Sequence, residues 1–191
     1  MILRISVGIR TSFFNQNVER LVNSTAAIEP LFLEDMKVGD HWLSPMREIS
    51  SEDVADFAML TGDNDPLHSS DASRSPFGEP VAHGLLGLSV LAGLSSQHPQ
   101  VATLALVGIS DWQFEAPVFF GDCVQVLTEV EQIQQHGRRS GRVTWIRQLL
   151  NQHGKIVQRG RFVTLVATRL RARHFSHSHE EMSPRGTLRA R

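Results

Sequence analysis

Hydrophobic positions follow a helical spacing in the first half of the chain and a strand-like spacing in the second half. Ser50 and Asp53 resemble a helix-capping box, and apolar side chains at helical spacing follow them until Gly62 offers a stop. Residues 81–94 contain no Lys, Arg, Asp or Glu, so we expect this segment to be buried on nearly all sides. The pattern therefore predicts a short amphipathic helix that ends just before Asp63, followed by a buried apolar helix.

Four segments in the second half alternate between apolar and polar residues or run apolar, namely 103–114, 124–133, 142–150 and 156–166. Turn-forming residues separate them, at 121–122, 136–137 and 151–154. We expect an α+β fold in which these strands form an antiparallel meander wrapped around the buried central helix. Periodicity by itself leaves other α+β layouts open.

The composition fits one globular domain. The chain has 191 residues, of which 41% are hydrophobic, enough for one sizeable core but short for two independent domains. No apolar run reaches the roughly 18 residues that a membrane-spanning helix needs, so we expect no membrane span. Acidic residues outnumber basic ones between 31 and 168, which argues against nucleic-acid binding by the folded part. Cys123 is the only cysteine, which favours a reducing compartment, and we expect the cytoplasm.

Both ends of the chain differ from the middle. Residues 1–30 contain several arginines and weakly resemble a mitochondrial transit segment, which makes the mitochondrial matrix an alternative compartment. Residues 169–191 are basic and polar, so we expect a mobile tail whose histidines (His174, His177 and His179) are solvated rather than metal-bound. We therefore divide the chain into an N-terminal extension (1–30), one domain (31–168) and a C-terminal tail (169–191).

The most specific local pattern is Gly-Asp-Asn-Asp-Pro-Leu-His at residues 62–68, followed by His83-Gly84. This pattern resembles the hydratase 2 motif of the MaoC-like (R)-specific enoyl-CoA hydratases and dehydratases, whose core reads Gly-Asp-x-Asn-Pro-x-His. Further agreeing blocks lie at 76–84, 111–114 and 117–122, so that the resemblance covers about 31–168 in the correct order. The resemblance implies a hot-dog fold, a homodimer, and an acyl-CoA or acyl carrier protein thioester as substrate.

The resemblance also implies roles for individual residues. Asp63 and His68 would be the catalytic acid/base pair, and the His83-Gly84 step would bind the substrate, with the N–H of Gly84 holding the thioester carbonyl. Ser89 matches a serine near the active site of the polyhydroxyalkanoate-type hydratases. Asp65 departs from the motif, which has Asn there, and an ionised Asp65 would bring a second negative charge close to the pair from a supporting position.

The chemistry of hydration is consistent with these residue types. Adding water to an α,β-unsaturated thioester requires a base that takes a proton from water and an acid that delivers one to Cα, which a carboxylate and an imidazole sharing one water can provide. Negative charge develops on the thioester oxygen, and an N–H at a helix N-terminus stabilises it. This reaction needs no metal or redox cofactor, and coenzyme A or pantetheine enters only as part of the substrate.

Several alternatives remain open from the sequence. Asp63 and His68 could be an ordinary loop aspartate and a hydrogen-bonded histidine, or two metal ligands, although no third ligand stands at a recognisable spacing. A hot-dog thioesterase would use a carboxylate to direct water at the thioester carbon, and a non-catalytic acyl-thioester-binding protein would retain only the fold. The densest basic cluster (Arg138, Arg139 and Arg142) reads better as a solvated hairpin than as a coenzyme A site.

Overall fold

A computed structural model describes residues 29–69 and 75–170. The strands are β1 (His41–Leu43), β2 (Arg47–Glu48), β3 (Thr103–Phe114), β4 (Cys123–Gln135), β5 (Ser140–Asn151) and β6 (Ile156–Ala167). The helices are α2 (Ser51–Thr61) and α3 (Gly84–Gln97), with short 3-10 turns η2 (Leu33–Asp35) and η3 (Pro66–His68). The four predicted strands are therefore confirmed to within a few residues at their ends, whereas the short β1 and β2 were not predicted.

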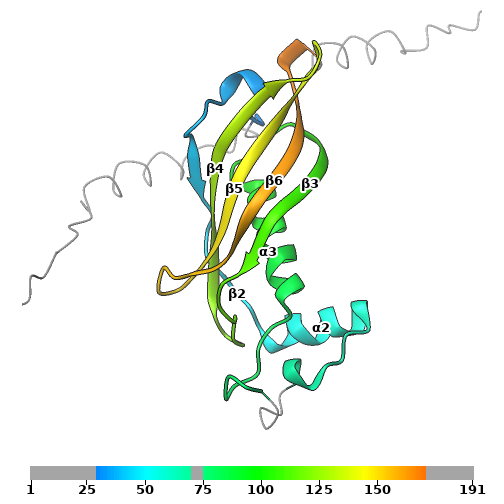
Figure 1. Cartoon of the computed structure of the whole chain (residues 1–191), viewed down its shortest axis with the longest axis vertical. Helices are drawn as coiled ribbons and strands as arrows, with labels where there is room; N and C mark the ends of the chain where they lie inside the picture. The colour runs from blue at the N-terminus through cyan, green and yellow to red at the C-terminus, as the bar shows by residue number, and fades with distance from the viewer. Residues whose placement is uncertain (1–28, 70–74, 171–191) are drawn as a thin grey trace, which may run out of the picture.

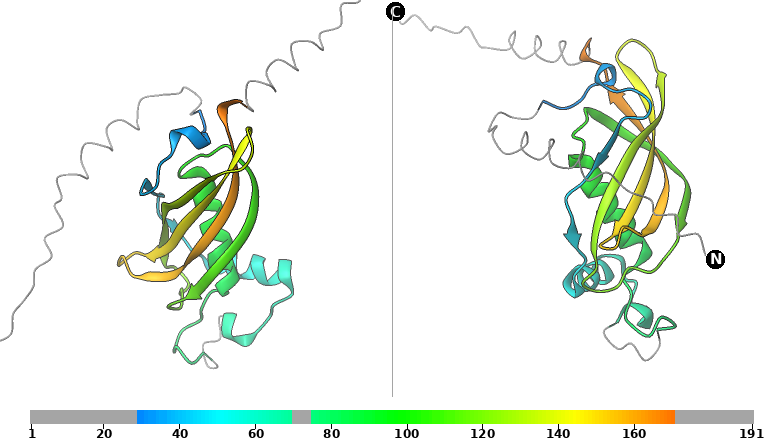
Figure 2. Two further views of the ribbon diagram at one scale, coloured as in Figure 1. Left: turned by 45° about the horizontal axis from the view of Figure 1, so that its top comes forward. Right: turned by 90° about the vertical axis from the view of Figure 1, so that its left-hand side faces the viewer.

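An antiparallel sheet with the order β1-β4-β5-β6-β3 curls around α3, and β2 pairs with β4 beside β1 (Figures 1 and 2). Strands β4, β5 and β6 form a meander, but β3 pairs with β6 and not with β4. The predicted simple meander is therefore wrong for β3. A period of two residues indicates which face of a strand is buried, but it does not specify the partner strand.

The core lies between α3 and the concave face of the sheet. Leu86, Val90 and Leu91 of the helix are buried against inward side chains of the strands, such as Trp145 and Phe162. The opposite face of α3 is open in the single chain, where Leu85 is 60% exposed. The expectation that this segment is buried on nearly all sides is therefore wrong for the chain alone, because the sheet covers only one face of the helix.

Helix α2 begins and ends where the sequence predicts. The side chain of Ser50 accepts a hydrogen bond from the N–H of Asp53 (3.1 Å), and the Asp53 carboxylate accepts one from the N–H of Ser50 (2.9 Å). Gly62 follows with a left-handed φ of 77° and donates its N–H to the carbonyl of Ala58. The reciprocal cap fixes where the helix begins, and the glycine fixes where it ends. The end of the helix in turn sets the position of the next residue, Asp63.

Most of the predicted N-terminal extension and C-terminal tail lies outside the described residues, and the domain limits stay a prediction. Within the described residues, no helix combines the length and apolar character needed to cross a bilayer. Cys123 is a half-buried free thiol.

Candidate active site

Three segments meet at one end of the sheet, where α2 ends, η3 follows it and α3 begins (Figure 1). The hydrogen bond from His83 to the backbone of Asp63 joins the loop after α2 to the residue that precedes α3. Val81, two residues earlier, accepts a hydrogen bond from His68 of η3. The two parts of the motif, which are separate in the sequence, therefore form one cluster.

A series of tight local hydrogen bonds shapes the loop from Asp63 to His68. The Asp63 carboxylate accepts a hydrogen bond from the N–H of Asp65 at 3.3 Å. The Asp65 carboxylate in turn caps η3 by accepting from the N–H of Leu67 at 2.9 Å, and Pro66 occupies the first turn. Asp65 therefore acts as a helix cap here, and an Asn side chain offers the same acceptor oxygen.

His68 points its ring toward the start of α3. Its Nδ1 lies 2.7 Å from the carbonyl oxygen of Val81. Because a carbonyl oxygen only accepts hydrogen bonds, Nδ1 must carry the proton and donate it. In the neutral ring, Nε2 is then free to accept a proton.

His83 contacts both Asp63 and His68. It is 3% exposed, and its Nε2 lies 3.0 Å from the carbonyl oxygen of Asp63, to which it donates. Its ring stacks on the ring of His68 with centroids 3.8 Å apart, and its buried Nδ1 has no hydrogen-bond partner within residues 29–69 and 75–170. The side chain of His83 thus holds the backbone of Asp63 and one face of the His68 ring.

Asp63, His68 and His83 each offer one ligand-type atom, and these atoms all lie within 4.8 Å of one another. The third possible metal ligand that sequence spacing did not reveal is therefore His83. In a tetrahedral zinc site, neighbouring ligand atoms lie about 3.4 Å from one another. The cluster offers a carboxylate and two imidazoles, and each ring already gives one nitrogen to a backbone carbonyl, which leaves His68 Nε2 and His83 Nδ1 for any other partner.

A cavity of about 390 Å³ opens beside the two histidines. Its other lining residues come from η3, the loop before α3, the start of α3, the end of β3 with the segment after it, and β6: Leu67, Phe77, Val81, Ala82, Gly84, Phe114, Glu115, Ala116, Pro117, Val118 and Gln158. In the part of the chain that the structure describes, no side chain caps the N-terminus of α3, and the first turn of α3 holds no acidic residue. The first N–H groups of this 14-residue helix, beginning with Gly84, are therefore able to bind an acceptor in the cavity.

A side chain at position 84 would intrude on the cavity. A Cβ built on Gly84 would lie 2.9 Å from Cε1 of Phe114, closer than an ordinary carbon–carbon contact. Glycine at this position therefore allows the ring of Phe114 to stand against the start of the helix.

Ser89 does not join the cluster. Its hydroxyl donates to the carbonyl of Leu85 within α3, and it is exposed and absent from the cavity lining. In the single chain, Ser89 therefore has the local role that a serine in an apolar helix commonly has.

Gln158 was not predicted as a site residue. It lies on β6, is 2% exposed, and donates from Nε2 to the carbonyl oxygen of Gly84 at 3.0 Å. Its Oε1 is buried and has no hydrogen-bond partner among the residues that the structure describes. The only signal in the sequence was a polar residue at an inward position of a strand.

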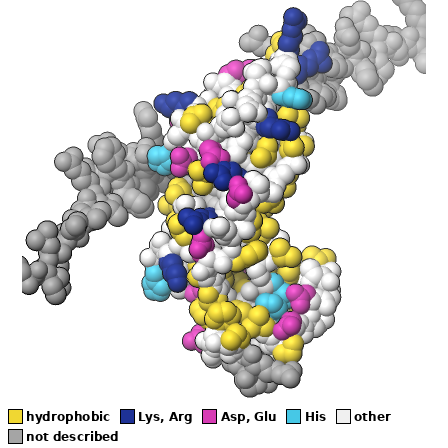
Figure 3. All heavy atoms as spheres, in the orientation of Figure 1, with side chains coloured by type: hydrophobic (Ala, Val, Ile, Leu, Met, Phe, Trp, Pro, Cys, Tyr) yellow, Lys and Arg dark blue, Asp and Glu magenta, His cyan; other side chains and the backbone are white. Residues whose placement is uncertain are grey.

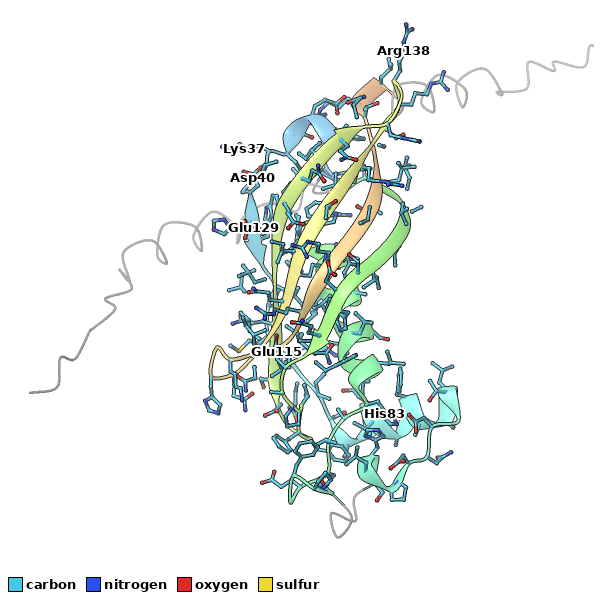
Figure 4. All side chains as sticks on the ribbon, in the orientation of Figure 1. Lys37, Asp40, His83, Glu115, Glu129 and Arg138 are labelled. Carbon is cyan, nitrogen blue, oxygen red and sulfur yellow. The ribbon has the colours of Figure 1, made fainter. Side chains whose placement is uncertain are left out.

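The arginine cluster of the sequence analysis lies far from the site. Figure 4 shows Arg138 at the opposite end of the sheet from His83.

Comparison with known proteins identifies the family of the chain. The MaoC like domain model matches residues 36–148. A 3-hydroxybutyryl-CoA dehydratase of Methylorubrum extorquens is 37% identical over 113 residues, which are 58% of this chain and 70% of that protein. An (R)-hydratase of A. caviae involved in PHA biosynthesis superposes with a TM-score of 0.57 at 28% identity, over 69% of this chain and 97% of that one.

The fold itself is shared more widely. A conserved hypothetical protein of Mycobacterium tuberculosis, described as having a double hotdog fold, superposes with a TM-score of 0.66 at 18% identity, over 83% of this chain and 46% of that one. The predicted α+β hot-dog architecture is thus confirmed. The chain belongs to the MaoC-like dehydratase domain family, which is related to (R)-specific enoyl-CoA hydratases and 3-hydroxyacyl-thioester dehydratases.

Proposed function

We propose that the protein is an (R)-specific hydratase or dehydratase of enoyl and 3-hydroxyacyl thioesters, with Asp63 and His68 as its acid/base pair. The observation that carries the proposal is that Asp63 lies beside His68 and His83, and that His68 lines one cavity together with the start of α3. The substrate is a thioester of coenzyme A or of an acyl carrier protein.

The hydrogen bond to Val81 supports a specific role for His68. With Nδ1 donating to that carbonyl, Nε2 takes a proton from water as the water oxygen attacks Cβ of the enoyl group. Asp63 accepts the second hydrogen bond of this water and orients it, and the pair returns one proton to Cα. Dehydration follows the same steps in reverse.

The start of α3 stabilises the charge that moves onto the thioester oxygen. An N–H of Gly84 directed at this oxygen binds the enolate-like transition state more strongly than the neutral carbonyl, because the charge is greatest there. Gln158 donates to the carbonyl of the same residue and so holds the next peptide unit, Gly84–Leu85, in place. His83 is then a positioning residue that acts through Asp63 and His68.

A homodimer fits the surface of the chain. Among the described residues, the 12-residue strand β3 pairs on one side only and is an edge strand. It carries exposed apolar side chains at Leu104, Leu106, Val107 and Ile109. Hydrophobic side chains follow this side of the molecule (Figure 3), and Leu85 of α3 adds to them. A long apolar edge needs a cover, and pairing of β3 with β3 of a second copy would provide it and would bury the open face of α3.

The direct test is to incubate the purified protein with crotonyl-CoA and follow loss of the conjugated thioester together with release of free thiol. Hydration to (R)-3-hydroxybutyryl-CoA without thiol release supports the proposal, and full activity in the presence of a chelator would agree with chemistry by the side chains alone. Thiol release would support a thioesterase instead, and the absence of both reactions would support a non-catalytic acyl-thioester-binding protein.

The half-buried thiol of Cys123, the one cysteine of the sequence, is consistent with the cytoplasm as the compartment.

A further inference from the structure

Arg147 is a buried cation in the interior of the fold. It lies on β5, is 9% exposed and faces α3 together with its neighbour Trp145, two residues away. Its guanidinium carbon lies 4.5 Å from the centre of the Phe162 ring and 5.8 Å from that of Trp145. These aromatic rings stabilise the cation in part but accept no strong hydrogen bond from it.

No carboxylate compensates this charge among residues 29–69 and 75–170. Arg47, Arg159, Arg161 and Arg169 each form an ion pair with an acidic side chain. Arg147 forms none there, and its Nε is buried without a hydrogen-bond partner. Burial lowers the pKa of Arg147 to about 10, so the group is still a cation at neutral pH. A buried charge without a counterion is costly to fold and is therefore uncommon.

A cavity of about 260 Å³ adjoins this guanidinium. Arg147 is the only charged residue among those that line it, and most of the others are apolar: Ala92, Pro99, Val101, Leu106, Trp145 and Phe162. Ser95 and Ser96 also face it, but their hydroxyls already donate to carbonyls of α3. Thr164 accepts a hydrogen bond from the indole of Trp145. Thr103 completes the lining, so Arg147 is the one cationic donor among the lining residues of a chamber whose walls are mostly apolar.

This chamber is separate from the candidate active site. The two cavities share no lining residue. The active-site cavity lies at Gly84, where α3 begins, whereas the chamber lies at Ala92 to Ser96, about 12–18 Å further along the helix at 1.5 Å per residue.

We propose that the chamber beside Arg147 binds a carboxylate that carries a short apolar body. The planar fork of a guanidinium matches a carboxylate with two parallel hydrogen bonds, and the apolar wall accommodates a hydrocarbon chain. The volume lies just below the ~300–1,000 Å³ of sites for drug-sized ligands, which fits a molecule of a few carbon atoms. Two sources offer this chemistry, a free short-chain carboxylate and the far end of an acyl thioester, and only the second source rests on the proposed function.

The test is calorimetric titration of the full chain with hexanoate and with hexanamide, its neutral analogue of nearly equal shape. We expect hexanoate to bind at least about 10-fold more tightly than hexanamide, because charge-assisted hydrogen bonds are lost with the amide. Arg147→Met keeps an unbranched stem but removes the guanidinium, and should bind hexanoate at least about 10-fold more weakly. Arg147→Lys should also bind hexanoate more weakly, because it retains the charge but loses the fork.

Arg142→Met is the matched control, because Arg142 lies on the same strand but is exposed. This variant should bind hexanoate as the wild type does. Equal binding of hexanoate and hexanamide by the wild type, absence of hexanoate binding, or unchanged binding in a folded Arg147→Met protein would each overturn the inference.

A second assay identifies the source of the carboxylate. If the carboxylate belongs to the substrate, Arg147→Met lowers kcat/KM at least about 10-fold for an enoyl-CoA with a terminal carboxylate and leaves crotonyl-CoA hydration unchanged. If it belongs to a free ligand, the variant loses hexanoate binding but treats both thioesters as the wild type does. A protein that binds hexanoate through Arg147 but hydrates neither thioester would refute the proposed function and leave the carboxylate site intact.

Discussion

The close contact between Gly84 and Phe114 makes a quantitative prediction about turnover. A Cβ at position 84 would stand 2.9 Å and 3.1 Å from two ring atoms of Phe114, so Gly84→Ala requires the ring to move. Overpacking of this kind costs about 1–3 kcal/mol, and the low end applies because Phe114 is 55% exposed and its ring has room to turn. About 1 kcal/mol at the transition state corresponds to a roughly 5-fold lower rate.

The effect on folding should be small, because the half-exposed ring of Phe114 has room to turn and alanine is compatible with the helical backbone at the first position of α3. Gly84→Ala should therefore keep the free energy of unfolding within ~1 kcal/mol of the wild type, while kcat/KM for crotonyl-CoA falls about 5-fold or more. The assay is a double-mutant cycle with Phe114→Ala, combined with denaturant unfolding of each variant. In the Phe114→Ala background, adding Gly84→Ala should have little further effect. An equal loss of activity in both backgrounds would show that crowding against Phe114 is not the cause.

Three further predictions concern other parts of the fold. Asp65→Asn keeps the acceptor that caps η3 and should leave thermal stability nearly unchanged, whereas Asp65→Ala should cost about 1 kcal/mol in denaturant unfolding. The N–H of Phe32 and the guanidinium of Arg169 hold the pKa of Asp35 below its usual 3.8, so this carboxylate adds stability above that pH and the gain is lost as the pH falls through the lowered value. Asp35→Asn should flatten the loss of stability below about pH 4, and an unchanged acid unfolding curve would contradict that assignment. Val107→Lys places a charge on the exposed β3 edge and should yield a folded monomer in sedimentation equilibrium, whereas an intact dimer would place the interface elsewhere.

Local signals explain how much of the fold could be predicted. The end of α2 was predictable because Ser50, Asp53 and Gly62 act within a few residues of one another. The pairing of β3 with β6 was not, because it joins residues such as Thr103 and Val166 that are distant in the chain. The open face of α3 was also not predictable. A segment without charged residues indicates burial, but it does not indicate whether its own chain or a second copy covers it.

Some features of the site were also predictable from the sequence, and others were not. Family resemblance located Asp63, His68 and the His83-Gly84 step, and the structure brings them together at one end of the sheet. The resemblance could not reveal that His83 stacks on His68. It also could not reveal that Gln158 donates to the carbonyl of Gly84, 74 residues away in the chain. Such contacts depend on how strands are placed around the helix, which no local pattern encodes.

The pair itself is tested most directly by the steady-state hydration of crotonyl-CoA by Asp63→Asn, His68→Ala and the double variant, each checked for folding by circular dichroism. We predict that each single variant lowers kcat at least ~100-fold, since a positioned acid/base group supplies about that much. The double variant should be little slower than either single variant, because the two groups act on one water as a unit. Near wild-type hydration by a folded single variant would contradict the assignment of Asp63 and His68 as the acid/base pair.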